Sequence, residues 1–253
     1  MDKPFTYGIN PLFEALKAGK RKCYRIITEE GKTNPRLQPI FEAARAQGVQ
    51  IETLPRDVFQ KKFKGIIHQG VIGYFAEKKT MALADLIKNA FSLSPRPTLA
   101  LLDGIQDPHN LGALIRSAEA LGVHGLILPD RRSAPLNETV AKCSSGAIEN
   151  LPIAWITNLA RTLEELKEAG FWIVGLDAQG AKFCHEFKFD MPTAVLIGGE
   201  EKGIRPLIKK TCDFSVAIPM QGRGESLNAS AAGTVIFYEI LRQKMALERA
   251  ETT

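Results

Sequence analysis

The sequence predicts an α/β protein with a mainly parallel sheet in its larger, C-terminal part and a small α/β unit at its N-terminus. Beyond residue 97, short apolar stretches alternate with segments of helix length, a pattern typical of a parallel sheet covered by helices. Residues 1–77 show a shorter succession of helix and strand patterns and are richer in basic side chains. Residues 78–96 include Ser92, Ser94 and Pro95 and are interpreted as a linker between the domains 1–77 and 97–253 that carries one short helix around residues 83–89.

The N-terminal unit begins with a Gly-Ile-Asn-Pro sequence, which is typical of a helix start. Glycines at positions 19 and 48 mark the ends of its two main helices. Alternating apolar residues predict strands after each of them. The predicted elements are a helix at 7–16, a strand at 25–28, a helix at 39–47, a strand at 49–54 and a short helix at 57–62, with the unit ending near Tyr74.

The charge is distributed unevenly along the chain. Residues 1–80 hold 15 Lys and Arg against 8 Asp and Glu, whereas residues 81–253 hold 18 against 20. Clustered cations are what binding to nucleic-acid phosphates requires. Lysine-rich surfaces also keep proteins in solution, so charge alone leaves both interpretations open.

Composition excludes several classes of protein. The chain has 253 residues, of which 45% are hydrophobic and 24% charged. This composition excludes a disordered, collagenous or coiled-coil protein. No run of some 18 apolar residues is present and the N-terminus lacks the apolar stretch of a signal peptide, so we expect a cytoplasmic protein without a membrane partner. The four cysteines show no C-x-x-C spacing, so we expect buried thiols and neither a disulfide framework nor a bound metal.

The C-terminal part is predicted to contain five buried strands separated by helix-length sequence. These strands lie at residues 99–102, 125–128, 172–176, 194–197 and 215–218. Three segments place glycine or polar residues directly after such a strand, where open α/β sheets bind ligands.

The first segment spans residues 102–119. Asn110 is predicted to cap a helix that ends at Gly122, with an apolar stripe that leaves Arg116 and Glu119 on another face. Taken alone, this segment is better explained by a capped helix with a surface ion pair and no further function.

The second segment, Leu196 to Ile204, is rich in glycine but is neither a P-loop nor a G-x-G-x-x-G motif. Its glycines would let a ligand lie against bare backbone, and Glu200 could receive a hydroxyl or an amine. A tight turn with solvated acidic residues is the alternative.

The third segment runs from Ile218 to Gly233. Two glycines are followed by Asn228, which can cap a helix whose first turns are nearly all small residues. Such a helix allows close packing of a ligand, a strand or a second subunit, although an ordinary capped C-terminal helix would look the same.

Together, and in this order, the three segments resemble the motifs of the SpoU (TrmH-like) 2′-O-ribose RNA methyltransferases of the SPOUT superfamily. The resemblance depends on the pattern Asn-x-Gly-x-x-x-Arg from Asn110 to Arg116, followed much later by Glu-Ser-Leu-Asn ending at Asn228. The resemblance covers residues 97–245, and residues 7–16 and 68–71 are similar to the small RNA-binding domain of the ribosomal-RNA members. It implies a SPOUT domain with a deep trefoil knot, a rare exception to the usual connection rules.

The resemblance implies that S-adenosylmethionine is the cofactor and that backbone groups of the second and third motifs hold it. The cofactor-binding residues would be Gly198, Ile218, Leu227, Asn228 and Ala229. The polar active-site set would be Asn110, Arg116, Glu200, Ser226 and Asn228. This chain reads Gly-Gly-Glu-Glu-Lys-Gly at the second motif, where many members have a small residue between Gly and Glu; Glu200 rather than Glu201 is therefore our assignment.

A ribose 2′-hydroxyl must lose its proton as it attacks a methyl group held in line with it. Proposals for the family give Arg116 the role of base, but an arginine guanidinium keeps its proton at neutral pH. We expect instead that Arg116 binds an RNA phosphate and stabilises charge, while Glu200, Asn110, Ser226 and Asn228 set the geometry.

The resemblance also implies partners. A motif arginine of these enzymes is thought to act across a subunit boundary, and the small-residue helix from Ala229 to Tyr238 could pair with a second copy, so we expect a two-fold homodimer. The basic N-terminal domain favours 23S rRNA or a ribosome-assembly precursor as the substrate, with a guanosine as the methylated nucleotide. We expect no binding to DNA. The alternatives are a tRNA 2′-O-methyltransferase, a non-catalytic knotted RNA-binding assembly protein, and an unrelated nucleotide-dependent α/β enzyme.

Overall fold

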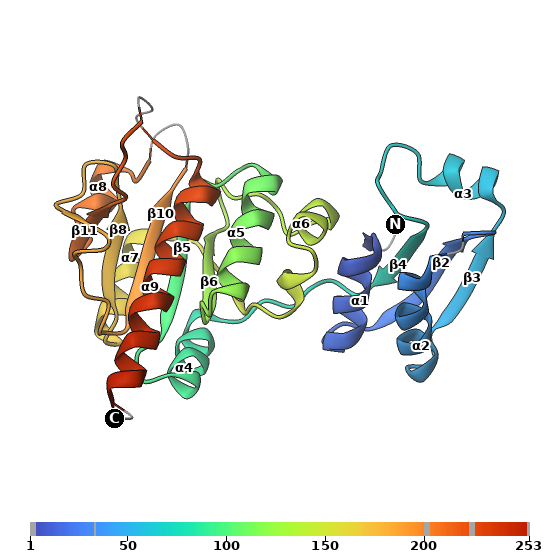
Figure 1. Ribbon diagram of the computed structural model, residues 1–253, viewed down its shortest axis with the longest axis horizontal. Coiled ribbons are helices and arrows are strands. Elements are labelled where there is room, and N and C mark those ends of the chain that lie inside the picture. The colour runs from blue at the N-terminus through green and yellow to red at the C-terminus, as the bar shows by residue number, and fades with distance from the viewer. Residues whose placement is uncertain (1–3, 33, 200–202, 223–225, 252–253) are drawn as a thin grey trace. The chain divides into compact units, whose positions relative to one another are not determined.

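In the computed structural model, which describes residues 4–32, 34–199, 203–222 and 226–251, the protein divides into two compact units. Unit 1 consists of Met1–Lys79 and Pro135–Asn150, and unit 2 of Thr80–Ala134 and Leu151–Thr253 (Figure 1). Both units are α/β, and the larger has a parallel sheet. The predicted fold class is therefore confirmed, whereas the knot stays a prediction because strand order does not define threading.

Unit 1 is built on a four-stranded sheet in the order β1-β4-β2-β3, in which only the β2–β3 pair is parallel. One face packs on α1 and α2 through residues such as Leu12, Leu16 and Ile40, and the other packs on Phe59 of α3. Its elements are β1 (Phe5–Tyr7), α1 (Ile9–Ala18), β2 (Cys23–Glu29), a 3₁₀ turn (Pro35–Leu37), α2 (Gln38–Ala46), β3 (Gln50–Leu54), α3 (Arg56–Lys62) and β4 (Val71–Phe75).

Unit 1 also contains a segment from the middle of the chain, 135–150, with α6 (Glu138–Cys143) and a 3₁₀ turn (Ala147–Glu149). The Glu149 carboxylate, 2% exposed, forms an ion pair with Arg21 at 2.9 Å. Lys142 Nζ donates a hydrogen bond of 3.0 Å to Gln69 Oε1. We expected this segment within the range 97–253 of the second domain, but its polar side chains pack on the N-terminal unit.

Unit 2 is built on a seven-stranded sheet in the order β7-β6-β5-β10-β8-β11-β9, and every strand pair in it is parallel. Because all strands run the same way, their carboxyl ends lie along one edge of the sheet. Its strands are β5 (Thr98–Asp103), β6 (Gly125–Pro129), β7 (Ile153–Ile156), β8 (Trp172–Leu176), β9 (Lys182–Phe183), β10 (Thr193–Gly198) and β11 (Phe214–Ala217). Its helices are α4 (Leu83–Leu93), α5 (Pro108–Ala120), α7 (Leu159–Glu168), α8 (Pro206–Lys209) and α9 (Ala229–Glu251).

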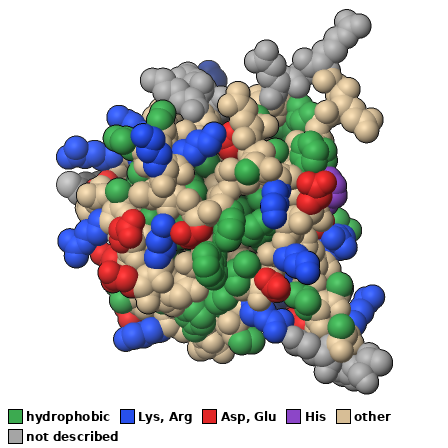
Figure 2. Space-filling model, turned by 90° about the vertical axis from the view of Figure 1, so that its left-hand side faces the viewer, with side chains coloured by type: hydrophobic (Ala, Val, Ile, Leu, Met, Phe, Trp, Pro, Cys, Tyr) green, Lys and Arg blue, Asp and Glu red, His purple; other side chains and the backbone are tan. Residues whose placement is uncertain are grey.

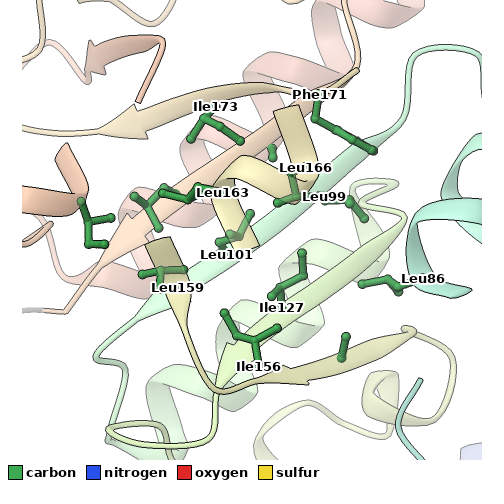
Figure 3. Packing of buried hydrophobic residues seen from close by; sticks show 14 of the residues in the cluster. Leu86, Leu99, Leu101, Ile127, Ile156, Leu159, Leu163, Leu166, Phe171 and Ile173 are labelled. Carbon is green, nitrogen blue, oxygen red and sulfur yellow. The ribbon is translucent and has the colours of Figure 1, made fainter. Parts of the chain in front are cut away.

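Helices cover both faces of this sheet. On one face, α4, α7 and α8 share a hydrophobic core with alternate strand residues such as Leu99, Leu101 and Leu196 (Figure 3). On the other face, α5 and α9 lie side by side (Figure 1). Gly233 of α9 lets the two approach closely, because a Cβ at this position would collide with the Leu114 side chain of α5. Residues 78–96, expected as a linker with a short helix around 83–89, hold the longer α4, whose Leu86 and Ala90 are fully buried in this core.

The outer edge of the unit 2 sheet ends in β9, which has only two residues. Figure 2 shows this side of the protein, where hydrophobic side chains form a strip between charged ones. Exposed apolar residues on the elements of this edge are Trp172, Phe183 and Phe214. A short edge strand limits pairing with other chains.

Within the described ranges, no helix is both long and apolar enough to cross a membrane. The same residues contain no group of three or more His, Cys, Asp or Glu arranged to hold a metal ion. All four cysteines are free thiols, with Cys23 and Cys184 buried and Cys143 and Cys212 half-buried.

Candidate active site

A cavity of about 580 Å³ lies in unit 2 at the carboxyl ends of β8, β10 and β11. Its walls come from the turns after these strands and from the start of α9, so segments far apart in the sequence meet there. The lining residues are Leu176–Gln179, Phe183, Ile197–Gly199, Gly203, Ile204, Ile218–Met220, Ser226, Leu227, Ala229 and Ala232. The volume is in the range of sites for small molecules and cofactors.

One wall of this cavity is backbone rather than side chain. Gly198 ends β10, and a Cβ there would collide with the backbone of Gly203 and Ile204. A Cβ on Gly199 would lie 2.5 Å from the Gly104 carbonyl oxygen. Gly203 N donates to Gly199 O at 2.9 Å, and Gly203 has a φ of +56°, which favours glycine. These close approaches explain why the sequence places glycines here.

Asp177 brings a carboxylate to the cavity directly after β8. Its oxygens accept hydrogen bonds from Gln179 N at 2.8 Å and pair with Lys209 Nζ at 2.7 Å. Burial acts to raise the pKa of Asp177, but the bonds from Lys209 and Gln179 outweigh it and hold the pKa below its usual value. The carboxylate is therefore ionised at neutral pH and can accept hydrogen bonds from hydroxyl or amino groups of a ligand.

Asn228 joins the cavity to the first motif. Its Oδ1 accepts a hydrogen bond from Ser230 N at 2.9 Å, as expected for the cap of α9. Its Nδ2 donates to Asn110 Oδ1 at 3.1 Å, although 118 residues separate the two. The fold thus unites two residues that the sequence analysis assigned to one site.

The start of α5 differs from our prediction. The cap is Asp107, whose carboxylate accepts hydrogen bonds from His109 N and Asn110 N, and Pro108 occupies the first helical position. Proline is favoured there because it has no N–H to satisfy. Asn110 is therefore inside the first turn, so its side chain is available for Asn228. The expected end of the helix at Gly122 is confirmed by the φ of +74° at that residue.

A second cavity, of about 460 Å³, shares Gly199 and Gly203 with the first. It lies between the turn after β5 and the turn after β10. Its other lining residues are Asp103–Asp107, Asn110, Arg132 and Arg205. Arg205 bonds bidentately to the buried Asp103, with Nε–Oδ2 and Nη2–Oδ1 distances of 2.8 and 3.0 Å, and so ties the two turns together.

The predicted site residues fall into three groups. Gly198, Ile218, Ser226, Leu227 and Ala229 line the larger cavity, and Asn110 lines the smaller one and contacts Asn228. Arg116 lines neither cavity and is exposed on α5. The hydroxyl of the next residue, Ser117, lies 2.7 Å from the hydroxyl of Thr234 on α9. Glu200 is outside the described residues.

Five charged residues line these cavities that sequence reasoning did not assign to the site: Asp177, Arg132 and Arg205, and also Asp103 and Asp107 of the first segment. Asp177 could have been found, since it directly follows a predicted buried strand. The two arginines lie in loops without a recognisable local pattern.

The larger cavity fits the cofactor that the sequence resemblance implies. Bare backbone at Gly198 and the adjacent turns can bind a flat nucleobase, and Asp177 can accept from sugar hydroxyls or an amino group.

Comparisons with known proteins give two matching family models and a series of similar chains. Residues 97–238 match the model of the SpoU rRNA Methylase family, and residues 5–81 match that of RNA 2′-O ribose methyltransferase substrate binding. The chain is 42% identical to the Putative TrmH family tRNA/rRNA methyltransferase YacO of Bacillus subtilis, over 95% of this chain and 96% of that one.

Two solved structures are also similar. The SpoU Methyltransferase AviRb from Streptomyces viridochromogenes, in complex with the cofactor AdoMet, superposes with a TM-score of 0.80 and 25% identity, over 96% of this chain and 90% of that one. The A. aeolicus TrmH/SpoU tRNA modifying enzyme superposes with a TM-score of 0.55 and 27% identity, over 66% of this chain and 86% of that one.

Proposed function

Because the chain belongs to the SpoU rRNA methylase family, we propose that it methylates the ribose 2′-hydroxyl of a guanosine in 23S rRNA or in a ribosome-assembly precursor. The chain is an S-adenosylmethionine-dependent RNA methyltransferase. The observation that carries the proposal is the glycine-walled cavity at the strand ends, next to the Asn228–Asn110 pair. When bound, the cofactor supplies an activated methyl group on a sulfonium.

Ribosomal RNA is favoured over tRNA by two observations. The family whose model matches unit 2 is described as an rRNA methylase family. The superposition with the A. aeolicus tRNA-modifying enzyme covers 66% of this chain. Residues 5–81 match a separate family model, which describes substrate binding by RNA 2′-O ribose methyltransferases. We propose that residues 1–77 bind the RNA and that residues 97–253 carry the methyltransferase site.

Within the site, the chain's own residues have separate tasks. Gly198, Ile218, Leu227 and Ala229 would hold the cofactor through backbone groups and small side chains. The Asn110 and Asn228 amides and the Ser226 hydroxyl would orient the ribose, with Glu200 as a further polar group of the second motif. Hydrogen-bonding groups held in place before the reaction stabilise developing charge at little reorganisation cost.

Arg116 would bind an RNA phosphate in the site of a second copy of the chain, because it lines neither cavity of its own unit. A guanidinium makes bidentate hydrogen bonds that an ammonium cannot reproduce. Arg116→Lys should therefore lose most of the methyl transfer at every pH. A wild-type rate with a new pH dependence would instead identify position 116 as the base.

The experiment is transfer of tritiated methyl groups from S-adenosylmethionine to three transcripts: 23S rRNA, 16S rRNA and a tRNA pool. We expect incorporation into 23S rRNA, at a guanosine whose 3′ linkage becomes resistant to alkali because the 2′-hydroxyl is blocked. Incorporation into tRNA alone would make the protein a tRNA enzyme. Cofactor binding without incorporation into any RNA would favour a non-catalytic assembly protein.

A further inference from the structure

The smaller cavity is not used by the proposed mechanism except at Asn110. It has a volume of about 460 Å³ and adjoins the cofactor cavity through Gly199 and Gly203. Asn110, on its wall, bonds to Asn228 at the start of α9. A molecule in the smaller cavity would therefore lie next to both the cofactor wall and the two asparagines.

The charges on the wall of this cavity are unequally compensated. Asp103 and Arg205 neutralise each other in a bidentate ion pair. The Asp107 carboxylate accepts hydrogen bonds from two backbone N–H groups at the start of α5, where the helix dipole also favours a negative charge. Arg132 makes no hydrogen bond or ion pair with any residue that the structure describes. Among the described residues that line the cavity, Arg132 is therefore the cation without a charged or hydrogen-bonded partner.

The backbone at Arg132 is in an unfavourable conformation. Its φ is +66°, in the left-handed region that glycine adopts without cost and that L-residues with long side chains rarely adopt. Next to it, the buried Ser133 Oγ has no hydrogen-bond partner within the described chain. Strained residues and unsatisfied groups concentrate at functional sites, where a side chain is needed in spite of its cost.

We propose that the smaller cavity is the acceptor site for the RNA strand and that Arg132 binds the phosphate group adjoining the methylated ribose. The inference rests on the proposed function and names the residue of the same chain that holds the substrate there. Phosphate is the group that fits, because a guanidinium offers several N–H donors in a planar fork. The cavity's position beside Asn110 and Asn228 brings the attached ribose to the residues that would orient it.

The test compares Arg132→Gln and Arg132→Gly with Arg131→Gln in the full-length protein. Arg131 is a matched control because it is the adjacent exposed arginine and lines neither cavity. Three quantities are measured: the KM for 23S rRNA as a function of KCl concentration, the Kd for S-adenosylmethionine by calorimetry, and the thermal unfolding midpoint.

We expect both Arg132 variants to raise the KM for RNA by about tenfold or more and to reduce the slope of log KM against log salt by about one, the value for one lost phosphate contact. Their Kd for S-adenosylmethionine should stay within about twofold of wild type. Arg132→Gly should unfold at the wild-type temperature or above, because glycine relieves the strained φ. Arg131→Gln should behave as wild type.

Equal KM values and salt slopes for Arg132→Gln and Arg131→Gln would overturn the inference. So would loss of cofactor binding in both Arg132 variants, which would give the residue a structural role. If the wild-type protein methylates no RNA, the proposed function fails instead. The variants are then compared by fluorescence anisotropy with labelled rRNA fragments, and a wild-type Kd for Arg132→Gln overturns the phosphate contact independently.

Discussion

Gly198 shapes the larger cavity, where we propose that the cofactor binds, by having no side chain. It ends β10 and lies against the backbone of Gly203 and Ile204, which cannot move away as a flexible side chain could. Because glycine has no side chain, these backbone segments can pack directly against each other at the wall of the cavity. The residue is therefore a sensitive point at which to test the site.

Gly198→Ala should weaken binding of S-adenosylmethionine by about tenfold or more, because forcing a methyl group into a closed space displaces the neighbouring backbone. Gly222→Ala is the matched control, since a Cβ at Gly222 meets no atom within 4 Å. Both variants are titrated by calorimetry, and circular dichroism verifies their fold. Equal affinities for the two variants would contradict the assignment of Gly198 to the cofactor cavity.

The Asp177 carboxylate should make the unfolding free energy of unit 2 fall at acid pH. Because its pKa in the folded state lies below its usual value, its ionisation stabilises the fold above the unfolded pKa, and this stabilisation is lost as pH falls through the folded pKa. The unfolding free energy of wild type minus that of Asp177→Asn should be constant from about pH 7 to pH 5 and should shrink below about pH 4.

Urea unfolding at a series of pH values measures this difference. Lys209→Met is the companion variant, because it removes the cation 2.7 Å from the carboxylate while keeping the side chain's length. Carboxyl titration by NMR should then show a higher pKa for Asp177. Parallel loss of stability in wild type and Asp177→Asn at all pH values would show that the Lys209 pair does not hold the carboxylate ionised.

At this scale, the sequence identified residues whose position follows from a strand end or a helix start. Asn228 and Gly198 belong to such points: Gly198 lines the larger cavity, and Asn228 caps α9 between the lining residues Leu227 and Ala229. Arg205 could not be found in this way, because its partner Asp103 is 102 residues away and no local spacing relates them.

At the scale of elements, the starts of α5 and α9 meet at one pair of amides. Asn228 caps α9 with its Oδ1 and donates from its Nδ2 to Asn110 in the first turn of α5. The two helices also pack along their length, with the Ser117 and Thr234 hydroxyls 2.7 Å apart. The Asn228 side chain therefore both caps α9 and contacts Asn110 of the candidate site.

Replacing Asn228 separates these two roles. Asn228→Ala should lower the unfolding free energy by about 1 kcal/mol, the usual effect of losing a helix cap. Asn228→Asp keeps an oxygen for the cap but cannot donate to Asn110, so it should unfold near the wild-type midpoint while its methyl-transfer rate falls. Thermal unfolding and single-turnover methyl transfer are measured side by side. Full activity in Asn228→Asp would show that the bond to Asn110 is not needed.

The prediction of elements succeeded where a local pattern was strong. The predicted strand at residues 172–176 matches β8, and the predicted helix at 57–62 differs from α3 by one residue. β4 was not predicted because all five of its residues are buried, so it shows no alternation of apolar and polar side chains. The short β1 and β7 also lacked a signal, because three or four residues are too few to show a period.

At the scale of the whole molecule, no sequence pattern indicated that residues 135–150 belong to unit 1. This assignment depends on contacts such as the Arg21–Glu149 ion pair, which joins residues 128 positions apart and is buried on both sides. A charged residue in a helix pattern is normally assigned to the surface. Only the tertiary structure shows that this charge has a buried partner.

The exposed surface of α9 favours a second copy of the chain as the neighbour of unit 2. Val235, Tyr238 and Met245 follow one another at helical spacing and are 39%, 57% and 45% exposed. Arg116 is exposed on the adjacent α5 and lines neither cavity of its own unit. A two-fold dimer formed through this face would cover the apolar side chains and place each Arg116 near the other chain's site.

Mixing two inactive variants tests this arrangement. In a dimer of Arg116→Ala with Asn110→Ala, one site would combine an intact Asn110 with an intact Arg116 from the other chain, and the second site would lack both. Random exchange of subunits makes half of the dimers mixed, so about a quarter of the wild-type methyl transfer should return. Native mass spectrometry shows whether mixed dimers have formed, and each variant alone is the control. If mixed dimers form and remain inactive, Arg116 acts within its own chain, and no residue of the second subunit is then needed at the site.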